Sequence, residues 1–78
     1  MDAKIRVIVR RKYDHPNGGR RYYMELAGPH DVITNAATKP GVADGLITGS
    51  LFQESDNAGK VWIFDETVDD WDPVGGGE

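Results

Sequence analysis

"KVWIFDETVDDWDP", residues 60–73, places two tryptophans and a phenylalanine within ten residues and sets five carboxylates among them. Its first five residues, 60–64, are rich in β-branched and aromatic side chains and predict a strand. The acidic stretch 65–70 predicts a turn, and residues 71–74 predict a short strand after it. Pro73 has no backbone N–H to donate, so this last strand is expected at the edge of a sheet.

A third strand is predicted immediately before this stretch, in "LITGSLFQES" (46–55). The turn between them, "DNAG" (56–59), offers Gly59 for the left-handed conformation. We expect Ser55 to lie opposite Lys60 across this turn. That register makes residues 46–74 an aromatic three-stranded unit.

The rings of this unit are predicted to form a small core, because cross-strand aromatic pairs stabilise a sheet beyond simple burial. With Phe64 opposite Trp71, one face would carry Leu51, Trp62, Phe64 and Trp71. The other face would carry Phe52, Val61 and Ile63, so the strand with Trp62 is expected to be central and covered on both sides. The alternative interpretation is an exposed aromatic platform for a sugar or a protein partner.

A basic hairpin is predicted over residues 4–27. "KIRVIVRRKY" (4–13) and "RRYYMELAG" (20–28) alternate in the manner of strands, and "DHPNGG" (14–19) is a cluster of turn residues. The first strand would direct Ile5, Val7 and Val9 to one side and Lys4, Arg6 and Arg10 to the other. The second would direct Tyr22, Met24 and Leu26 to one side.

Residues 28–45 contain two prolines and three glycines and have no sustained period. We interpret them as a long irregular loop or arm, with one helical turn around 32–37 capped by Asp31. "GGGE" (75–78) is expected to be a flexible tail. No segment has a 3.6-residue apolar period, so the predicted fold class is all-β: a small antiparallel sheet of two hairpins plus a short edge strand.

Composition predicts one small domain, residues 1–78, with a thin core. The chain has 78 residues, of which 38% are hydrophobic and none is cysteine, so disulfides cannot supplement the core. His15 and His30 belong to no ligand-spaced cluster, and we expect no metal and no cofactor. Self-association or docking on a larger partner would then stabilise the fold. No apolar run approaches the roughly 18 residues that span a membrane, and no signal-peptide core is present, so a soluble chain without a membrane partner is expected.

Charge is unevenly distributed along the chain. Residues 1–24 carry seven cations and two acids, which makes +5, whereas residues 25–78 carry two cations and eleven acids, which makes −9; together these give the net charge of −4. The basic and acidic strands could simply be neighbours within one sheet. Alternatively, the basic end of one copy could meet the acidic end of the next.

No catalytic constellation is apparent, so we expect a protein that is not an enzyme. The carboxylates of 65–72 lack the glycine and the spacing of a calcium loop and suit a solvated turn. Nucleic acid is the binding hypothesis with a visible footprint, because basic residues of the hairpin are interleaved with Tyr13, Tyr22 and Tyr23. The acidic balance of residues 25–78 argues against it.

Four segments of the chain carry a resemblance to a known family. They are "YYMELAG" (22–28), "TKPGVADG" (38–45), "TGSLFQESDNAGKVWIFDE" (48–66) and Trp71, in that order. Together they resemble small proteins encoded among the virion-assembly genes of tailed phages and prophages, over roughly residues 21–74. The chain departs from that pattern in its "PHDVITNAA" insert (29–37) and in its basic first hairpin.

The resemblance implies a non-enzymatic virion structural or accessory protein, such as a capsid decoration, head-fibre or tail-associated protein. It would occupy the host cytoplasm during assembly and the virion afterwards, bind capsid or tail proteins, and form a homo-oligomer. Large rings and arginines are the expected anchors of such an interface. The candidate interface residues are Tyr22, Tyr23, Trp62, Trp71, Arg10, Arg11, Arg20 and Arg21. A small glycan- or nucleic-acid-binding β module is the alternative function.

Overall fold

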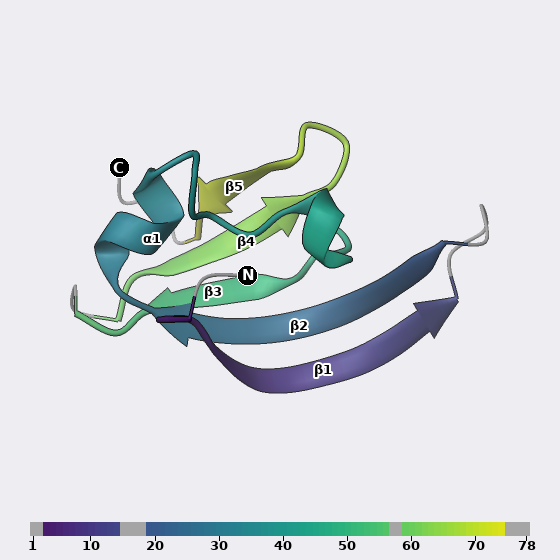
Figure 1. The fold of residues 1–78 in the computed structure, drawn as a ribbon, viewed down its shortest axis with the longest axis horizontal. Coiled ribbons are helices and arrows are strands. Elements are labelled where there is room, and N and C mark those ends of the chain that lie inside the picture. The colour runs from purple at the N-terminus through teal and green to yellow at the C-terminus, as the bar shows by residue number, and fades with distance from the viewer. Residues whose placement is uncertain (1–2, 15–18, 57–58, 75–78) are drawn as a thin grey trace.

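Five strands form one sheet in the order β1-β2-β3-β4-β5 (Figure 1). A computed structural model describes residues 3–14, 19–56 and 59–74. The strands are β1 (Arg6–Asp14), β2 (Arg20–Gly28), β3 (Leu51–Glu54), β4 (Val61–Asp65) and β5 (Asp70–Pro73). The predicted all-β fold is confirmed, and β5 lies at an edge as Pro73 predicted. The predicted tail, 75–78, and His15 lie outside the described residues.

The sheet is mixed, which differs from the expected antiparallel sheet. β1–β2, β3–β4 and β4–β5 are antiparallel as predicted, but β2 and β3 run parallel, with Leu26 opposite Phe52. Parallel neighbours require a crossover that carries the chain back to its starting end. Residues 29–50 supply that crossover here.

The crossover is a layer over one face of the sheet. It contains the helix α1 (His30–Thr34) and the 3₁₀ turn η1 (Val42–Asp44). Val32, Ile33 and Leu46 are buried in the core cluster. The interpretation of 28–45 as a long irregular loop or arm is therefore corrected in part, because its scattered apolar residues cover the sheet. The predicted helical turn is present but spans His30–Thr34. α1 begins after Pro29, and Asp31 lies within its first turn, so Asp31 is not the cap.

The core lies between the crossover and the sheet. Met24 and Leu26 of β2, with Phe52, Phe64 and Trp71 from the three following strands, are all buried on this covered face. The Trp71 ring lies 5.0 Å from that of Phe64 and 6.0 Å from that of Phe52, between ring centroids. The predicted aromatic core is confirmed, with Phe64 opposite Trp71 as expected.

The register between β3 and β4 differs by one residue from the expected one. Phe52 lies opposite Trp62 and Leu51 opposite Ile63, since the backbone N–H of Glu54 donates to the carbonyl oxygen of Lys60 at 2.7 Å. A one-residue shift exchanges the two faces of a strand. Phe52 therefore joins the core in place of Leu51, and the prediction of a β4 strand covered on both sides is wrong.

A bulge in β1 explains why its predicted alternation fails. Val7 lies opposite Leu26 and Val9 opposite Glu25, with one extra residue, Ile8, between them. A bulge inserts a residue without a partner, so Val7 and Val9 point to opposite faces.

Among the residues described, no helix is long and apolar enough to cross a membrane.

Candidate functional site

The face of the sheet opposite the crossover has no covering layer in the described structure. One row of directly paired residues, which we call a rung, crosses all five strands. It consists of Val9, Glu25, Leu51, Ile63 and Asp72. We call this surface the open face and define it by eleven residues. They are Arg6, Val9, Arg11, Tyr23, Glu25, Ala27, Leu51, Gln53, Val61, Ile63 and Asp72. Each of them is partly or fully exposed, whereas the core residues of the same strands are buried.

The open face has an apolar centre and oppositely charged sides. Leu51, Val61 and Ile63 occupy the two strands β3 and β4, and Ile63 is 38% exposed. Arg6 and Arg11 lie on β1 at one side, and Asp72 lies on β5 at the other. An apolar patch with a charged rim is the usual arrangement of a protein interface.

Glu25 is the carboxylate on the basic half of the open face. Its Oε2 atom accepts a hydrogen bond of 2.9 Å from the hydroxyl of Tyr23. This hydrogen bond, with some desolvation, raises the pKa of Tyr23 above its ordinary value, although the nearby Arg11 acts in the opposite direction. The Glu25 carboxylate therefore has a donor of its own on the open face.

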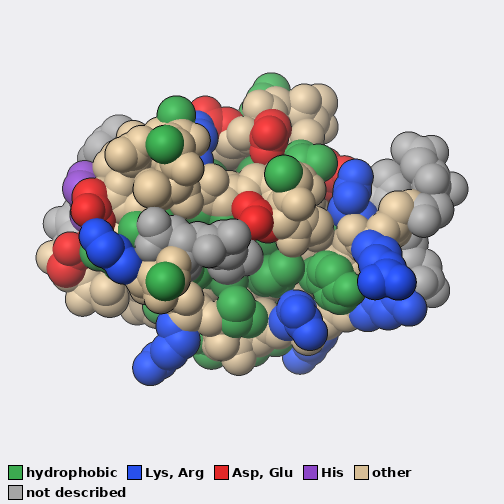
Figure 2. All heavy atoms as spheres, in the orientation of Figure 1, with side chains coloured by type: hydrophobic (Ala, Val, Ile, Leu, Met, Phe, Trp, Pro, Cys, Tyr) green, Lys and Arg blue, Asp and Glu red, His purple; other side chains and the backbone are tan. Residues whose placement is uncertain are grey.

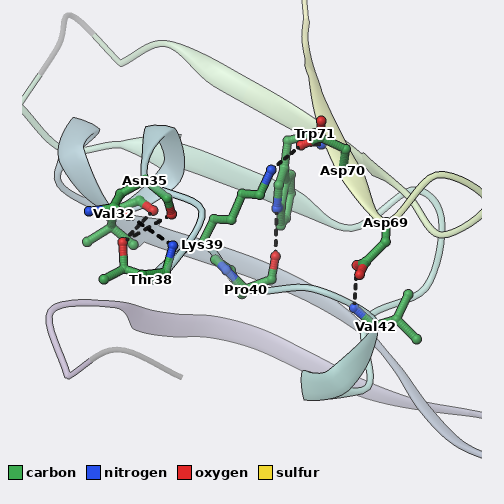
Figure 3. A network of polar contacts seen from close by, with 10 residues as sticks. Val32, Asn35, Thr38, Lys39, Pro40, Val42, Asp69, Asp70 and Trp71 are labelled. Atoms are coloured by element: carbon green, nitrogen blue, oxygen red, sulfur yellow. Dashed lines mark hydrogen bonds and ion pairs between the residues drawn. The ribbon is translucent and has the colours of Figure 1, made fainter.

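The acidic turn between β4 and β5 holds the crossover in place (Figure 3). The Oδ1 atom of Asp69 accepts a hydrogen bond of 2.8 Å from the backbone N–H of Val42, and that of Asp70 accepts one of 2.8 Å from Nζ of Lys39. The hydrogen bonds from Lys39 and from the Trp71 backbone lower the pKa of Asp70. Across 3–14, 19–56 and 59–74, no group of three His, Cys, Asp or Glu side chains could hold a metal ion.

Glu54 is a buried carboxylate, 1% exposed, that sequence reasoning missed. It accepts hydrogen bonds from Nε1 of Trp62 at 2.5 Å and meets Nδ1 of His30 at 2.8 Å. The backbone N–H of His30 also donates to Oδ1 of Asp56 at 2.8 Å. These contacts join the start of α1 to the β3–β4 hairpin.

The basic hairpin extends past the other strands as a two-stranded ribbon (Figure 1). β3 pairs with β2 only from Glu25 onward, and one further bridge joins Tyr22 to Leu46. The ribbon carries Arg10, Arg11, Lys12, Arg20 and Arg21. None of these five forms an ion pair with a described carboxylate. The guanidinium of Arg10 lies 5.1 Å from the centroid of the Tyr22 ring.

Charges are separated in space as well as in sequence. In Figure 2 most Lys and Arg side chains gather over β1 and β2, and most Asp and Glu side chains gather over the rest of the visible face.

The structure divides the eight candidate interface residues among three places. Trp71 is in the core, and Trp62 and Tyr22 are partly buried against it. Nζ of Lys60 lies 4.6 Å from the centroid of the Trp62 ring. Tyr23 and Arg11 lie on the open face, at the start of the ribbon. Arg10, Arg20 and Arg21 lie on the ribbon outside the open face. Val61 and Ile63 were predicted on this face, but as a covered one, whereas Leu51 was predicted on the core face and reaches the open face through the register shift.

The chain was compared with protein-family models, with curated proteins and with solved structures, and none of these comparisons finds a match.

Proposed function

We propose that this chain is a non-enzymatic structural or accessory protein of a phage virion and that it docks on capsid or tail proteins. The observation that carries the proposal is the open face, an uncovered sheet surface with Ile63 and its apolar neighbours at the centre. The resemblance of residues 21–74 to virion-assembly proteins supplies the biological setting.

Two features of the fold support docking as the mode of action. In the part of the chain that the structure describes, only one side of the sheet has a core, so burial of the other side by a partner would add stability to a small domain. The charged residues at the two sides of the open face would fix the orientation of that partner, since charge complementarity governs specificity more than affinity.

The test is incorporation into particles. Phage particles are purified from hosts that express the wild-type chain, Ile63→Asp or Val68→Asp, and the copies per particle are counted by quantitative mass spectrometry. Val68 is the matched control, because it is 64% exposed in the β4–β5 turn and lies off the open face. We expect wild type and Val68→Asp in the particles and a loss of at least tenfold for Ile63→Asp. Absence of the wild-type chain from particles would refute the proposal.

A second candidate function is nucleic-acid binding by the ribbon, favoured by cations that form no ion pair with a described carboxylate and lie near tyrosine rings. A two-stranded ribbon fits the major groove of duplex DNA, and exposed rings can stack on single-stranded bases. Fluorescence anisotropy with single-stranded and duplex DNA tests it. Replacing Lys12 and Arg20 by serine should weaken binding and reduce its salt dependence by about two counterions, whereas replacing Lys39, which pairs with Asp70, should not. No binding by wild type at low salt would exclude this function.

A further inference from the structure

We propose that the open face binds the open face of a second copy of this chain, with β1 of each copy over β5 of the other. The inference rests on the proposed function, because it names the first partner of the same docking surface. It is carried by three observations: the protected edges of the sheet, the charges at the two sides of the open face, and the apolar residues between them.

The edges of the sheet are unsuited to pairing with another copy. β1 carries arginines and the bulge between Val7 and Val9, and both features discourage the addition of a strand. β5 contains Pro73, which has no N–H to donate, and is only 4 residues long. Self-association would therefore use a face of the sheet, and the open face is the one that the crossover leaves uncovered.

The charges select one arrangement of the two copies. A two-fold axis parallel to the strands reverses the strand order, so the rung that begins at Val9 would lie over the rung that begins at Asp72 of the second copy. Arg6 and Arg11 flank Val9 on the same strand and would face that carboxylate. A two-fold axis across the strands would instead place β1 over β1 and bring arginines together. Like charges across an interface are costly, which excludes the second arrangement.

The same operation brings apolar residues together at the centre. β3 is the middle strand, so Leu51 of one copy would face Leu51 of the other. On β2, Ala27 would face Val61 of the second copy, and Glu25 would lie over its Ile63. Aligned sheets pack about 10 Å apart with their strands within about 30° of each other. Glu25 would lie near this centre, where its carboxylate already accepts a hydrogen bond from the hydroxyl of Tyr23. The interface is isologous, as in the two-fold symmetric dimers that are the commonest soluble oligomers.

Sedimentation velocity over a range of protein concentrations tests the dimer. We expect wild type and Val68→Asp to dimerise and Ile63→Asp to be monomeric, with the near-ultraviolet circular dichroism of the buried Trp71 reporting that each variant is folded. Arg11→Glu and Asp72→Arg should each weaken the dimer by about tenfold. The double variant should recover most of that loss, because the reversed charges face each other again. A double variant as weak as the sum of the two single ones would overturn the proposed arrangement.

A cross-link provides a second test that does not depend on affinity. The chain has no cysteine, so Leu51→Cys introduces a single thiol near the proposed axis. A short bis-maleimide should join two copies of this variant and should leave Val68→Cys uncoupled. Wild type that stays monomeric at millimolar concentration overturns the inference; if that monomer is still incorporated into particles, the proposed function stands without it. A dimer that is absent from particles would support the inference and refute the proposed function.

Discussion

The indole N–H of Trp71 donates a hydrogen bond of 2.9 Å to the carbonyl oxygen of Pro40, and it joins the edge strand β5 to the crossover (Figure 3). Both residues are buried, and they lie 31 positions apart in the chain. Asp69 and Asp70 reinforce the same junction through Val42 and Lys39. The acidic turn and the start of β5 thus hold the crossover on the sheet.

Trp71→Phe should lower the free energy of unfolding by about 1–3 kcal/mol, because the Pro40 carbonyl would be left buried without a donor. The phenyl ring retains much of the packing against Phe64. Urea unfolding measures the effect. Tyr13→Phe is the control, since Tyr13 is 49% exposed and should change stability by less than about 0.5 kcal/mol. Equal effects of the two variants would contradict the role of this hydrogen bond.

Glu54→Leu should destabilise the protein by about 2–4 kcal/mol, because Trp62 and His30 would lose their common partner inside the fold. Gln53→Leu is the neighbouring control on the opposite face, where Gln53 is exposed. Its effect should stay within about 0.5 kcal/mol. A stable Glu54→Leu protein would show that the buried carboxylate can be replaced by simple apolar packing.

Gly41→Ala should destabilise the crossover, since a Cβ atom at this position would lie 2.5 Å from Oδ1 of Asp69. Asp69 would have to move away from the Val42 N–H, at a cost of about 0.5–1.5 kcal/mol. A double-mutant cycle separates this cause from others. In an Asp69→Ala background the same glycine substitution should cost clearly less, and an unchanged cost would exclude the clash with Asp69.

The Lys39–Asp70 contact predicts an acid-sensitive component of stability. The pKa of Asp70 is lowered from its ordinary value of 3.8 in the folded protein, by Lys39 first and then by the Trp71 backbone N–H. A lowered pKa contributes stability that is fully present above 3.8 and is lost as the pH falls through the folded value. The effect is small because the Asp70 side chain is 55% exposed.

The comparison of wild type with Asp70→Asn between pH 6 and 2 measures this component. Urea midpoints of the two proteins should differ at the upper end of that range and converge at the lower end. A difference that stays constant with pH would mean that Asp70 stabilises the fold through contacts other than its charge.

The positions of the strands follow from local patterns in the chain. Tyr22, Met24 and Leu26 alternate with polar residues, and β2 forms there with those three side chains toward the core. Gly59 has a positive φ of 71°, the left-handed conformation expected for it in the turn after β3. These features could be predicted because alternation and turn chemistry act between residues that are near neighbours in sequence.

The candidate site could not be predicted, because it depends on which face of each strand is covered. The shift that places Phe52 opposite Trp62 sends Leu51 to the face where Val61 and Ile63 lie, and that face is the one without a covering layer in the described structure. Nothing in "LFQES" (51–55) alone distinguishes the two registers, since both Leu51 and Phe52 are apolar. Burial of Glu54 follows from the same shift and depends on His30, which is 24 positions away.

Local side-chain order thus set where the chain extends and where it turns, and which segments carry each sign of charge. The tertiary structure alone selected the register of β3, the parallel pairing of β2 with β3, and the side of the sheet that the crossover covers. Each of these choices is made by contacts between distant residues, such as Trp71 with Pro40. These contacts form, and stabilise the fold, only after loop closure has brought the distant residues together. No short stretch of sequence therefore predicts them.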